Sequence, residues 1–130
     1  MNNRKKVLVV DDQKIIADVM DAYFKQCGGA RLLYAENGQQ AIQLARDEAP
    51  DLIFLDIMMP GIDGYKVCRY LKGDPHTRDI PVVFLSAGQD RAEALSEEAG
   101  GDGFVGKPFV AQEILGVLSR YLGCSPTSAP

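Results

Sequence analysis

With 130 residues, of which 46% are hydrophobic and 25% charged, the chain fits one globular domain with one core. Its net charge of −4 argues against direct binding to nucleic acid, and it contains no apolar run of the roughly 18 residues that a membrane span needs. Three widely separated cysteines (Cys27, Cys68 and Cys124) and a polar first segment predict free thiols and a cytoplasmic protein.

Short apolar runs alternate with amphipathic segments in the first half of the chain. Residues 7–10 form a continuous apolar run that predicts a buried strand, and apolar residues recur at helical spacing over 15–27. Residues 31–35 predict a second strand. A helix is expected to begin at Asn37-Gly38 and to end before Pro50, because the residue that precedes a proline avoids the helical region.

The alternation continues through the second half. Apolar runs at 52–55 and 82–85 predict the third and fourth strands, and 104–105 predicts a short fifth one. A helix after Asp63-Gly64 should direct Val67, Cys68 and Leu71 inward. The segment 91–99 predicts a weaker helix, with a stripe of only three apolar residues, and 110–121 predicts a final amphipathic helix.

Five strands that alternate with five helices predict an α/β fold, in which a parallel sheet is covered by helices on both faces. We expect a single domain over residues 6–123. Residues 1–5 are interpreted as an N-terminal extension, and residues 124–130 as a disordered tail or the stub of a linker.

Polar side chains stand where the apolar strands end. Asp11 and Asp12 follow the first strand, Asp56 closes the third, Ser86 follows the fourth and Lys107 follows the fifth. The carboxyl ends of parallel strands share one edge of a sheet, which is where open α/β sheets bind ligands. The sequence therefore predicts that three carboxylates, one hydroxyl and one ammonium meet at that edge.

This set of residue types suits metal-assisted phosphoryl chemistry. Neighbouring carboxylates repel one another, so they either hold protons or bind a cation, and Mg²⁺ prefers oxygen ligands while it keeps several waters. An isolated Asp11-Asp12 pair would more simply be a solvated turn, but Asp56 on a neighbouring strand favours a metal site. Asp56 could then accept a phosphoryl group, whose oxygens Lys107 would neutralise and Ser86 could hydrogen-bond.

The ordered motifs resemble the receiver domain of bacterial two-component response regulators, of the chemotaxis-regulator type. The resemblance extends from Lys6 to about Leu122. It rests on these residues: Asp11-Asp12, Asp56 through Met59-Pro60 to Asp63-Gly64, Ser86-Ala87, Phe104, and Lys107-Pro108. It implies a flavodoxin-like, doubly wound sheet with strand order 2-1-3-4-5.

The resemblance also implies roles for individual residues. Asp56 would be phosphorylated by the phosphohistidine of a sensor histidine kinase or a phosphotransfer protein. Asp12, Asp56 and the backbone carbonyl of Met58 would hold Mg²⁺, while Asp11 would act on the ion through water. Lys107 would contact the phosphoryl group, and its bond to the following proline would be cis.

The family's switching behaviour is implied in the same way. Ser86 would swing toward the phosphoryl group, and Phe104 would follow it inward. The surface formed by the fourth helix, fifth strand and fifth helix would then change and control an output protein or domain, with homodimer formation on phosphorylation as one outcome. Such a switch catalyses only its own phosphorylation and dephosphorylation.

Two departures from the family pattern, and one rival function, follow from the residues around Asp56. Met58 and Gly88 stand where polar side chains are frequent, so we expect the attacking water to be poorly oriented and self-hydrolysis to be slow. A metal-dependent phosphatase or phosphotransferase is the alternative function. It is weakened because Ile57 and Met58 follow Asp56 without the second carboxylate that aspartate-nucleophile phosphatases carry two positions on.

Overall fold

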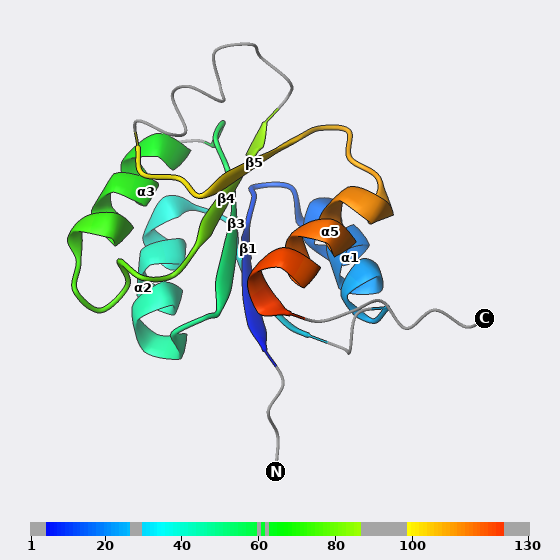
Figure 1. Cartoon of the computed structure of the whole chain (residues 1–130). Helices are drawn as coiled ribbons and strands as arrows, with labels where there is room; N and C mark the ends of the chain where they lie inside the picture. Colours follow the sequence, from blue (N-terminus) through cyan, green and yellow to red (C-terminus); the bar gives the residue numbers. More distant parts are fainter. Residues whose placement is uncertain (1–4, 27–29, 60, 62, 87–98, 124–130) are drawn as a thin grey trace.

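The computed structural model describes residues 5–26, 30–59, 61, 63–86 and 99–123, and Figure 1 shows their arrangement around a central sheet. The elements, in chain order, are β1 (Lys6–Val10), α1 (Lys14–Phe24), β2 (Arg31–Ala35), α2 (Gly38–Glu48), β3 (Leu52–Asp56), α3 (Gly64–Gly73), β4 (Val82–Ser86), β5 (Gly103–Gly106) and α5 (Ala111–Leu122). All four neighbouring strand pairs are parallel, and the order β2-β1-β3-β4-β5 is the one implied by the family resemblance.

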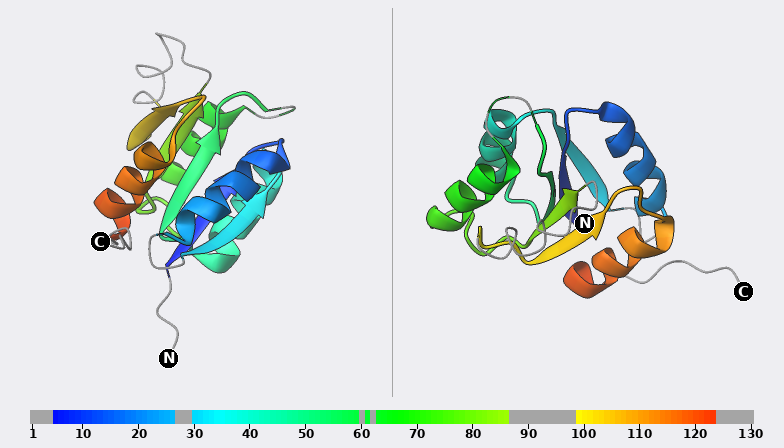
Figure 2. Two further views of the ribbon diagram at one scale, coloured as in Figure 1. Left: turned by 90° about the vertical axis from the view of Figure 1, so that its right-hand side faces the viewer. Right: turned by 90° about the horizontal axis from the view of Figure 1, so that it is seen from above.

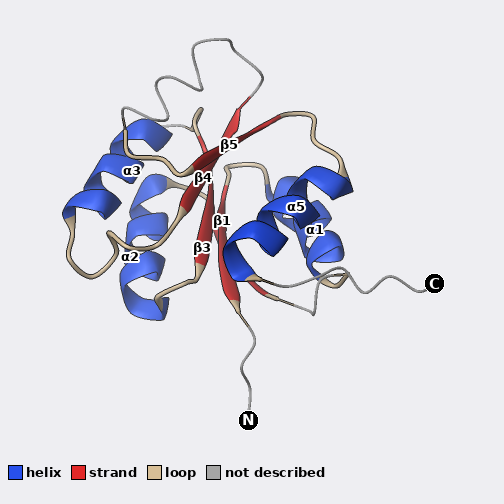
Figure 3. Cartoon of the chain, in the orientation of Figure 1, coloured by secondary structure: helices blue, strands red, loops and turns tan. Residues whose placement is uncertain are grey.

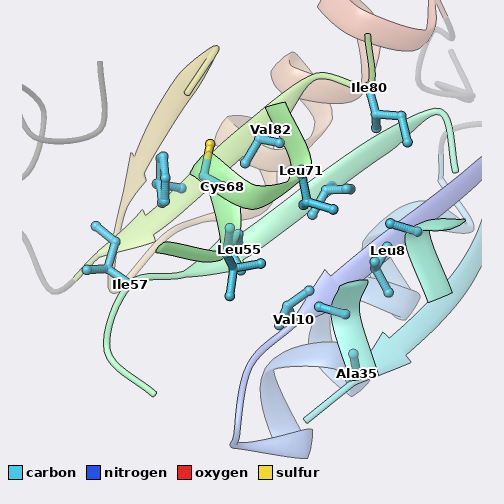
Figure 4. Close-up of a cluster of buried hydrophobic side chains, with 14 of the residues drawn as sticks. Leu8, Val10, Ala35, Leu55, Ile57, Cys68, Leu71, Ile80 and Val82 are labelled. Atoms are coloured by element: carbon cyan, nitrogen blue, oxygen red, sulfur yellow. The ribbon is translucent and has the colours of Figure 1, made fainter. Parts of the chain in front are cut away.

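The sheet lies between two layers of helices, as the βα alternation predicted. Helices α2 and α3 cover one face, and α1 and α5 cover the other (Figures 2 and 3). Alternate residues of β1 point to opposite faces: Leu8 and Val10 join the cluster under α2 and α3, whereas Val7 and Val9 join the cluster under α1 and α5. Figure 4 shows the first cluster, in which Leu71 and Cys68 of α3 pack over the strands. The single core that composition suggested is therefore divided by the sheet.

The three central strands explain why their sequences are continuously apolar. Every residue of β3 and β4 is buried, as are the last four residues of β1, because helices cover both faces of these strands. In register, Val10 lies beside Leu55, and Asp56 lies beside Leu85. The residues that follow β1, β3 and β4 are thereby brought to the same edge of the sheet.

Side-chain caps set the starts of two helices close to where the sequence predicted them. Asn37 accepts a hydrogen bond from the amide of Gln40 (2.9 Å) at the start of α2, and Asp63 accepts one from Lys66 (2.9 Å) at the start of α3. Helix α2 ends at Glu48, where Ala49 adopts a left-handed conformation with φ of 47° ahead of the proline.

Two helix boundaries differ from prediction, and one predicted helix is not described. Helix α1 ends at Phe24, whose buried ring stacks on Phe54 with centroids 6.3 Å apart, so it is shorter than the predicted 15–27. Helix α5 begins one residue late because Val110 keeps an extended backbone as the N-cap. Apart from Ala99, the predicted helix 91–99 lies outside the described residues, as do Cys27 and Cys124.

The amino-terminal edge of the sheet is fastened by a network that the sequence did not reveal. The ammonium of Lys72, in the last turn of α3, donates to the carbonyl of Ile80 and to Oδ2 of Asp102, both at 2.8 Å. The same Asp102 oxygen accepts the amide of Val82 (2.8 Å), and the hydroxyl of Tyr121 donates to the Asp102 carbonyl (2.7 Å). The connection that leads into β5 is thus tied to α3, β4 and α5.

Among the described residues, the helices are too short or too polar to cross a lipid bilayer.

Candidate functional site

Three carboxylates converge at the carboxyl edge of the sheet. Asp11 and Asp12 follow β1, Asp56 ends β3, and one carboxylate oxygen from each lies within 4.8 Å of the others. Asp11 is fully buried and Asp56 is 5% exposed, whereas Asp12 is exposed to solvent. The structure therefore brings together the acidic residues that the sequence singled out, with Asp12 at the open side of the cluster.

Lys107 supplies the positive charge of the site from the loop between β5 and α5. Its ammonium donates to Oδ2 of Asp11 at 2.7 Å and lies 3.6 Å from Oδ1 of Asp56. The Lys107 amide donates to the carbonyl of Ser86, which joins the ends of β4 and β5 beneath the side chain. The Lys107–Pro108 peptide bond is cis, as the family resemblance implied.

The ionisation of Asp56 reflects this crowding. Burial, followed by the negative charge of Asp11, raises the pKa of Asp56 from 3.8 to about 6. Lys107 and a 3.2 Å hydrogen bond from the amide of Met58 act in the opposite direction but do not cancel the rise. Three carboxylates thus lie close to a single ammonium, an arrangement that favours a further cation.

The turn after Asp56 is shaped by a close approach at the start of α3. The amide of Gly64 donates to the carbonyl of Ile57 (3.0 Å), and a Cβ at position 64 would collide with the carbonyl oxygen of Asp56. Glycine is therefore required where α3 meets the turn after Asp56. Met58 is 76% exposed in this turn, beside the Asp56 carboxylate that its amide contacts. Gly88 lies outside the described residues.

The two residues expected to switch occupy neighbouring strands. Ser86 is buried at the end of β4 and pairs in register with Gly106, next to Lys107. Phe104 is half-buried in β5, lies opposite Phe84, and packs against the cluster under α2 and α3. Phe104 also borders a hollow of about 320 Å³ between β5 and α5, which is further lined by Val105, Gln112, Glu113, Gly116, Val117 and Arg120.

A second hollow opens on the other side of Lys107. It measures about 390 Å³ and lies between α1 and the loop that precedes α5. Its lining is Ile16, Val19, Lys107, Pro108 and Phe109, so four of its five side chains are apolar. The neighbouring Ile15 is 62% exposed. An apolar surface thus adjoins the charged site.

Sequence reasoning missed one residue that touches the site. Tyr34, in β2, donates its hydroxyl to the main-chain carbonyl of Asp11 at 2.7 Å. The segment 31–35 was interpreted only as a strand. The available signal was a tyrosine near the carboxyl end of the strand beside β1, but its reach depends on the register, which the sequence alone does not give.

Comparison with known proteins identifies the family. The sequence profile of the response regulator receiver domain matches residues 7–119. The chain belongs to this family. Receiver domains act as signalling switches, generally without further enzymatic activity. Over 119 residues this receiver domain is 39% identical to the phosphate regulon transcriptional regulatory protein PhoB of Pseudomonas aeruginosa. The aligned region covers 91% of this chain and 52% of PhoB. The chain spans about half the length of the curated relatives that it matches.

Solved structures share the fold along nearly the whole receiver domain. A putative response regulator from Chloroflexus aurantiacus superimposes with a TM-score of 0.87 at 30% identity, covering 93% of this chain and 99% of that one. The receiver domain of a Pseudomonas aeruginosa sensor histidine kinase gives a TM-score of 0.83 at 26% identity, covering 92% and 98%. That second structure was determined with a magnesium ion coordinated in its active-site cleft.

Proposed function

We propose that this receiver domain is a switch that accepts a phosphoryl group on Asp56 in the presence of Mg²⁺. The observation that carries the proposal is the acidic cluster of Asp11, Asp12 and Asp56 with the ammonium of Lys107 against it. Asp56 is nearly buried and lies 3.6 Å from the Lys107 ammonium, whereas both carboxylate oxygens of Asp11 already accept hydrogen bonds. We assign residues 6–123 to the switch, with 1–5 as an extension and 124–130 as a tail or linker.

The donor atoms of the cluster suit Mg²⁺. All three side chains offer hard carboxylate oxygens, and their combined charge exceeds that of the single ammonium. We assign direct coordination to Asp12, Asp56 and the backbone carbonyl of Met58. Asp11 is assigned a contact through water, because its Oδ1 already accepts the Gln13 amide (2.9 Å) and its Oδ2 accepts Lys107. When bound, the ion would offset negative charge on the phosphoryl oxygens.

The protein's own groups account for the transfer. An oxygen of the Asp56 carboxylate forms the new P–O bond as the P–N bond of the donor phosphohistidine breaks, and the departing imidazole nitrogen takes up a proton from water. The Lys107 ammonium, which donates to Asp11 in the structure, would then pair with a phosphoryl oxygen. In self-hydrolysis, water attacks phosphorus, the bond to Asp56 breaks, and inorganic phosphate leaves.

The switch would run from the charged edge into β4 and β5. Ser86 ends β4 where its hydroxyl could hydrogen-bond a phosphoryl oxygen, and Phe104 is half-buried on the adjacent strand. An inward movement of the Phe104 ring, which packs on the face covered by α2 and α3, would shift β5, the strand that borders the hollow beside α5. We therefore assign the output surface to β5, α5 and the fourth helix of the family, whose segment lies outside the described residues.

The partners follow from these assignments. A sensor histidine kinase or a phosphotransfer protein would supply the phosphoryl group, and the apolar hollow beside Lys107 offers it a surface next to the chemistry. An output domain or protein would respond to the altered β5–α5 face, with homodimer formation as one form of that response. Curated relatives such as PhoB are transcriptional regulators, which supports an output linked to transcription.

Incubation with Mg²⁺ and acetyl phosphate or phosphoramidate tests the proposal. Intact-mass spectrometry should detect one added phosphoryl group, and neither Asp56→Asn nor protein in excess EDTA should gain it. The matched control is Asp63→Asn, in the same loop, because Asn can replace Asp as the N-cap of α3. Modification that persists in Asp56→Asn, or that needs no divalent cation, would contradict the assignment.

The rival phosphatase has no specific support in the described part of the chain. Ile57 and Met58 follow Asp56, so the position two residues on carries a thioether rather than a carboxylate that could act as general acid. Multiple turnovers of a phosphoester substrate, measured as phosphate release per protein, would favour the enzyme. Release of at most one phosphate per phosphorylated protein would favour the switch.

A further inference from the structure

Tyr34 reaches the acidic cluster from the neighbouring strand. In register, Tyr34 lies beside Val9 and Ala35 beside Val10, so the tyrosine is two residues back from the turn that carries the acidic pair. Its half-buried ring packs against the cluster under α1 and α5, and its hydroxyl donates to the main-chain carbonyl of Asp11 at 2.7 Å. The ring's packing therefore fixes the position from which the hydroxyl donates.

This contact completes the restraint of Asp11. The Asp11 amide donates to the carbonyl of Ala35 (3.1 Å), Oδ1 accepts the Gln13 amide (2.9 Å), and Oδ2 accepts Lys107 (2.7 Å). The fourth polar group, the main-chain carbonyl, is the one that Tyr34 holds. Two of the four restraints come from β2, which contributes none of the residues assigned to metal binding or phosphoryl transfer.

The Asp11 carbonyl matters because it belongs to the peptide unit that joins Asp11 to Asp12. A peptide unit is planar, so a hydrogen bond that orients its carbonyl also orients the following N–H and Cα. Asp12 is the exposed member of the cluster. The orientation of this peptide unit therefore helps to set where the Asp12 carboxylate lies relative to the other two.

We propose that Tyr34 is a positioning residue that sets the direction of the Asp11-Asp12 turn for a divalent cation. This inference rests on the proposed function, because it concerns the Mg²⁺ affinity of the same cluster.

A merely structural role is the competing explanation, and the chain contains a matched control for it. Tyr121 also donates its hydroxyl to the main-chain carbonyl of an aspartate, Asp102, again at 2.7 Å. That bond lies at the opposite edge of the sheet. Tyr34→Phe and Tyr121→Phe each remove one oxygen and keep a ring, so both should lower the urea midpoint, but only the first should affect the metal site.

Isothermal titration of the folded protein with MgCl₂ is the first measurement. Tyr34→Phe should weaken Mg²⁺ binding about tenfold, the low end of the effects seen when outer-shell partners of metal ligands are removed, and Tyr121→Phe should leave it unchanged. Equal Mg²⁺ affinity in Tyr34→Phe and wild type, or an equal loss in both variants, would overturn the inference.

Amide hydrogen exchange in EDTA is the second measurement, and it does not depend on metal. The Gln13 amide, which binds Asp11 Oδ1, should exchange faster in Tyr34→Phe than in wild type or Tyr121→Phe. Unchanged exchange would contradict a positioning role. If wild type binds no Mg²⁺, the proposed function fails and the metal part of the inference with it, while the exchange result still decides whether Tyr34 orders the turn.

Discussion

Replacement of Asp56 by Asn should stabilise the metal-free domain at neutral pH. The carboxylate is almost fully buried and shares its surroundings with Asp11, and its ionisation is opposed by both effects. Asn has nearly the same shape, keeps an oxygen that can accept the Met58 amide, and carries no charge. The variant therefore removes a buried charge and its repulsion with Asp11 from the folded state.

The size of the effect follows from the pKa. Folding raises the Asp56 pKa from 3.8 to about 6. At roughly 1.4 kcal/mol per pKa unit, ionised Asp56 lowers the free energy of unfolding by about 3 kcal/mol. We expect Asp56→Asn to recover about 2 kcal/mol of this, because the buried Asn amide also loses its hydration. Between these two pKa values the folded state binds more protons than the unfolded state, so wild-type stability falls as pH rises through that window.

Urea unfolding in EDTA, followed by circular dichroism between pH 4.5 and 8, measures the prediction. The free energy of unfolding of Asp56→Asn should exceed that of wild type at pH 7.5, and the difference should shrink as the pH approaches 4.5. The N-cap variant Asp63→Asn should show no such trend. A pH-independent difference, or an Asn variant less stable than wild type at pH 7.5, would refute the reasoning and imply that Lys107 fully compensates the buried charge.

Four other variants probe separate parts of the domain. Lys107→Met should bind Mg²⁺ more tightly, because a competing positive charge is lost, yet react more slowly with acetyl phosphate at saturating Mg²⁺. If Mg²⁺ affinity and the rate of phosphorylation both rose or both fell, the assignment of Lys107 to the phosphoryl group would be contradicted. Gly64→Ala should destabilise the domain by about 2 kcal/mol or more in urea unfolding, whereas Gly116→Ala, with open space around its Cβ on α5, should stabilise it by about 0.5–1 kcal/mol. Met58→Asn should shorten the phosphoryl lifetime, measured as decay of the phosphorylated mass, and an unchanged lifetime would argue against a role for side-chain polarity there.

The acidic cluster and its lysine were predictable because a parallel sheet gathers the ends of its strands. Each apolar run was short, bounded and followed by a polar residue, so the positions of Asp11, Asp56 and Lys107 at one edge needed only the assumption that the strands are parallel. The strand order did not follow from the pattern, since several orders satisfy right-handed crossovers; it came from the resemblance to receiver domains and is confirmed by the structure.

Contacts that depend on register or on long separations could not be read from the sequence. Lys72 and Asp102 are 30 positions apart and come from segments that gave no sign of pairing. Tyr34 needed the register of β1 and β2 before its hydroxyl could be placed. The end of α1 was misjudged because Phe24 fills the core at the point where the helix stops, whereas the apolar periodicity continues to Cys27 in the sequence.

The hydrogen bonds of Lys72 lie at the edge of the sheet opposite the acidic cluster. A single ammonium fastens the last turn of α3, the residue before Pro81 and the acidic residue that leads into β5. These hydrogen bonds tie α3 to the segment that leads into β5. Loss of the Lys72 side chain would therefore detach α3 from both other segments at once, while Asp102 would keep its bonds to Val82 and Tyr121.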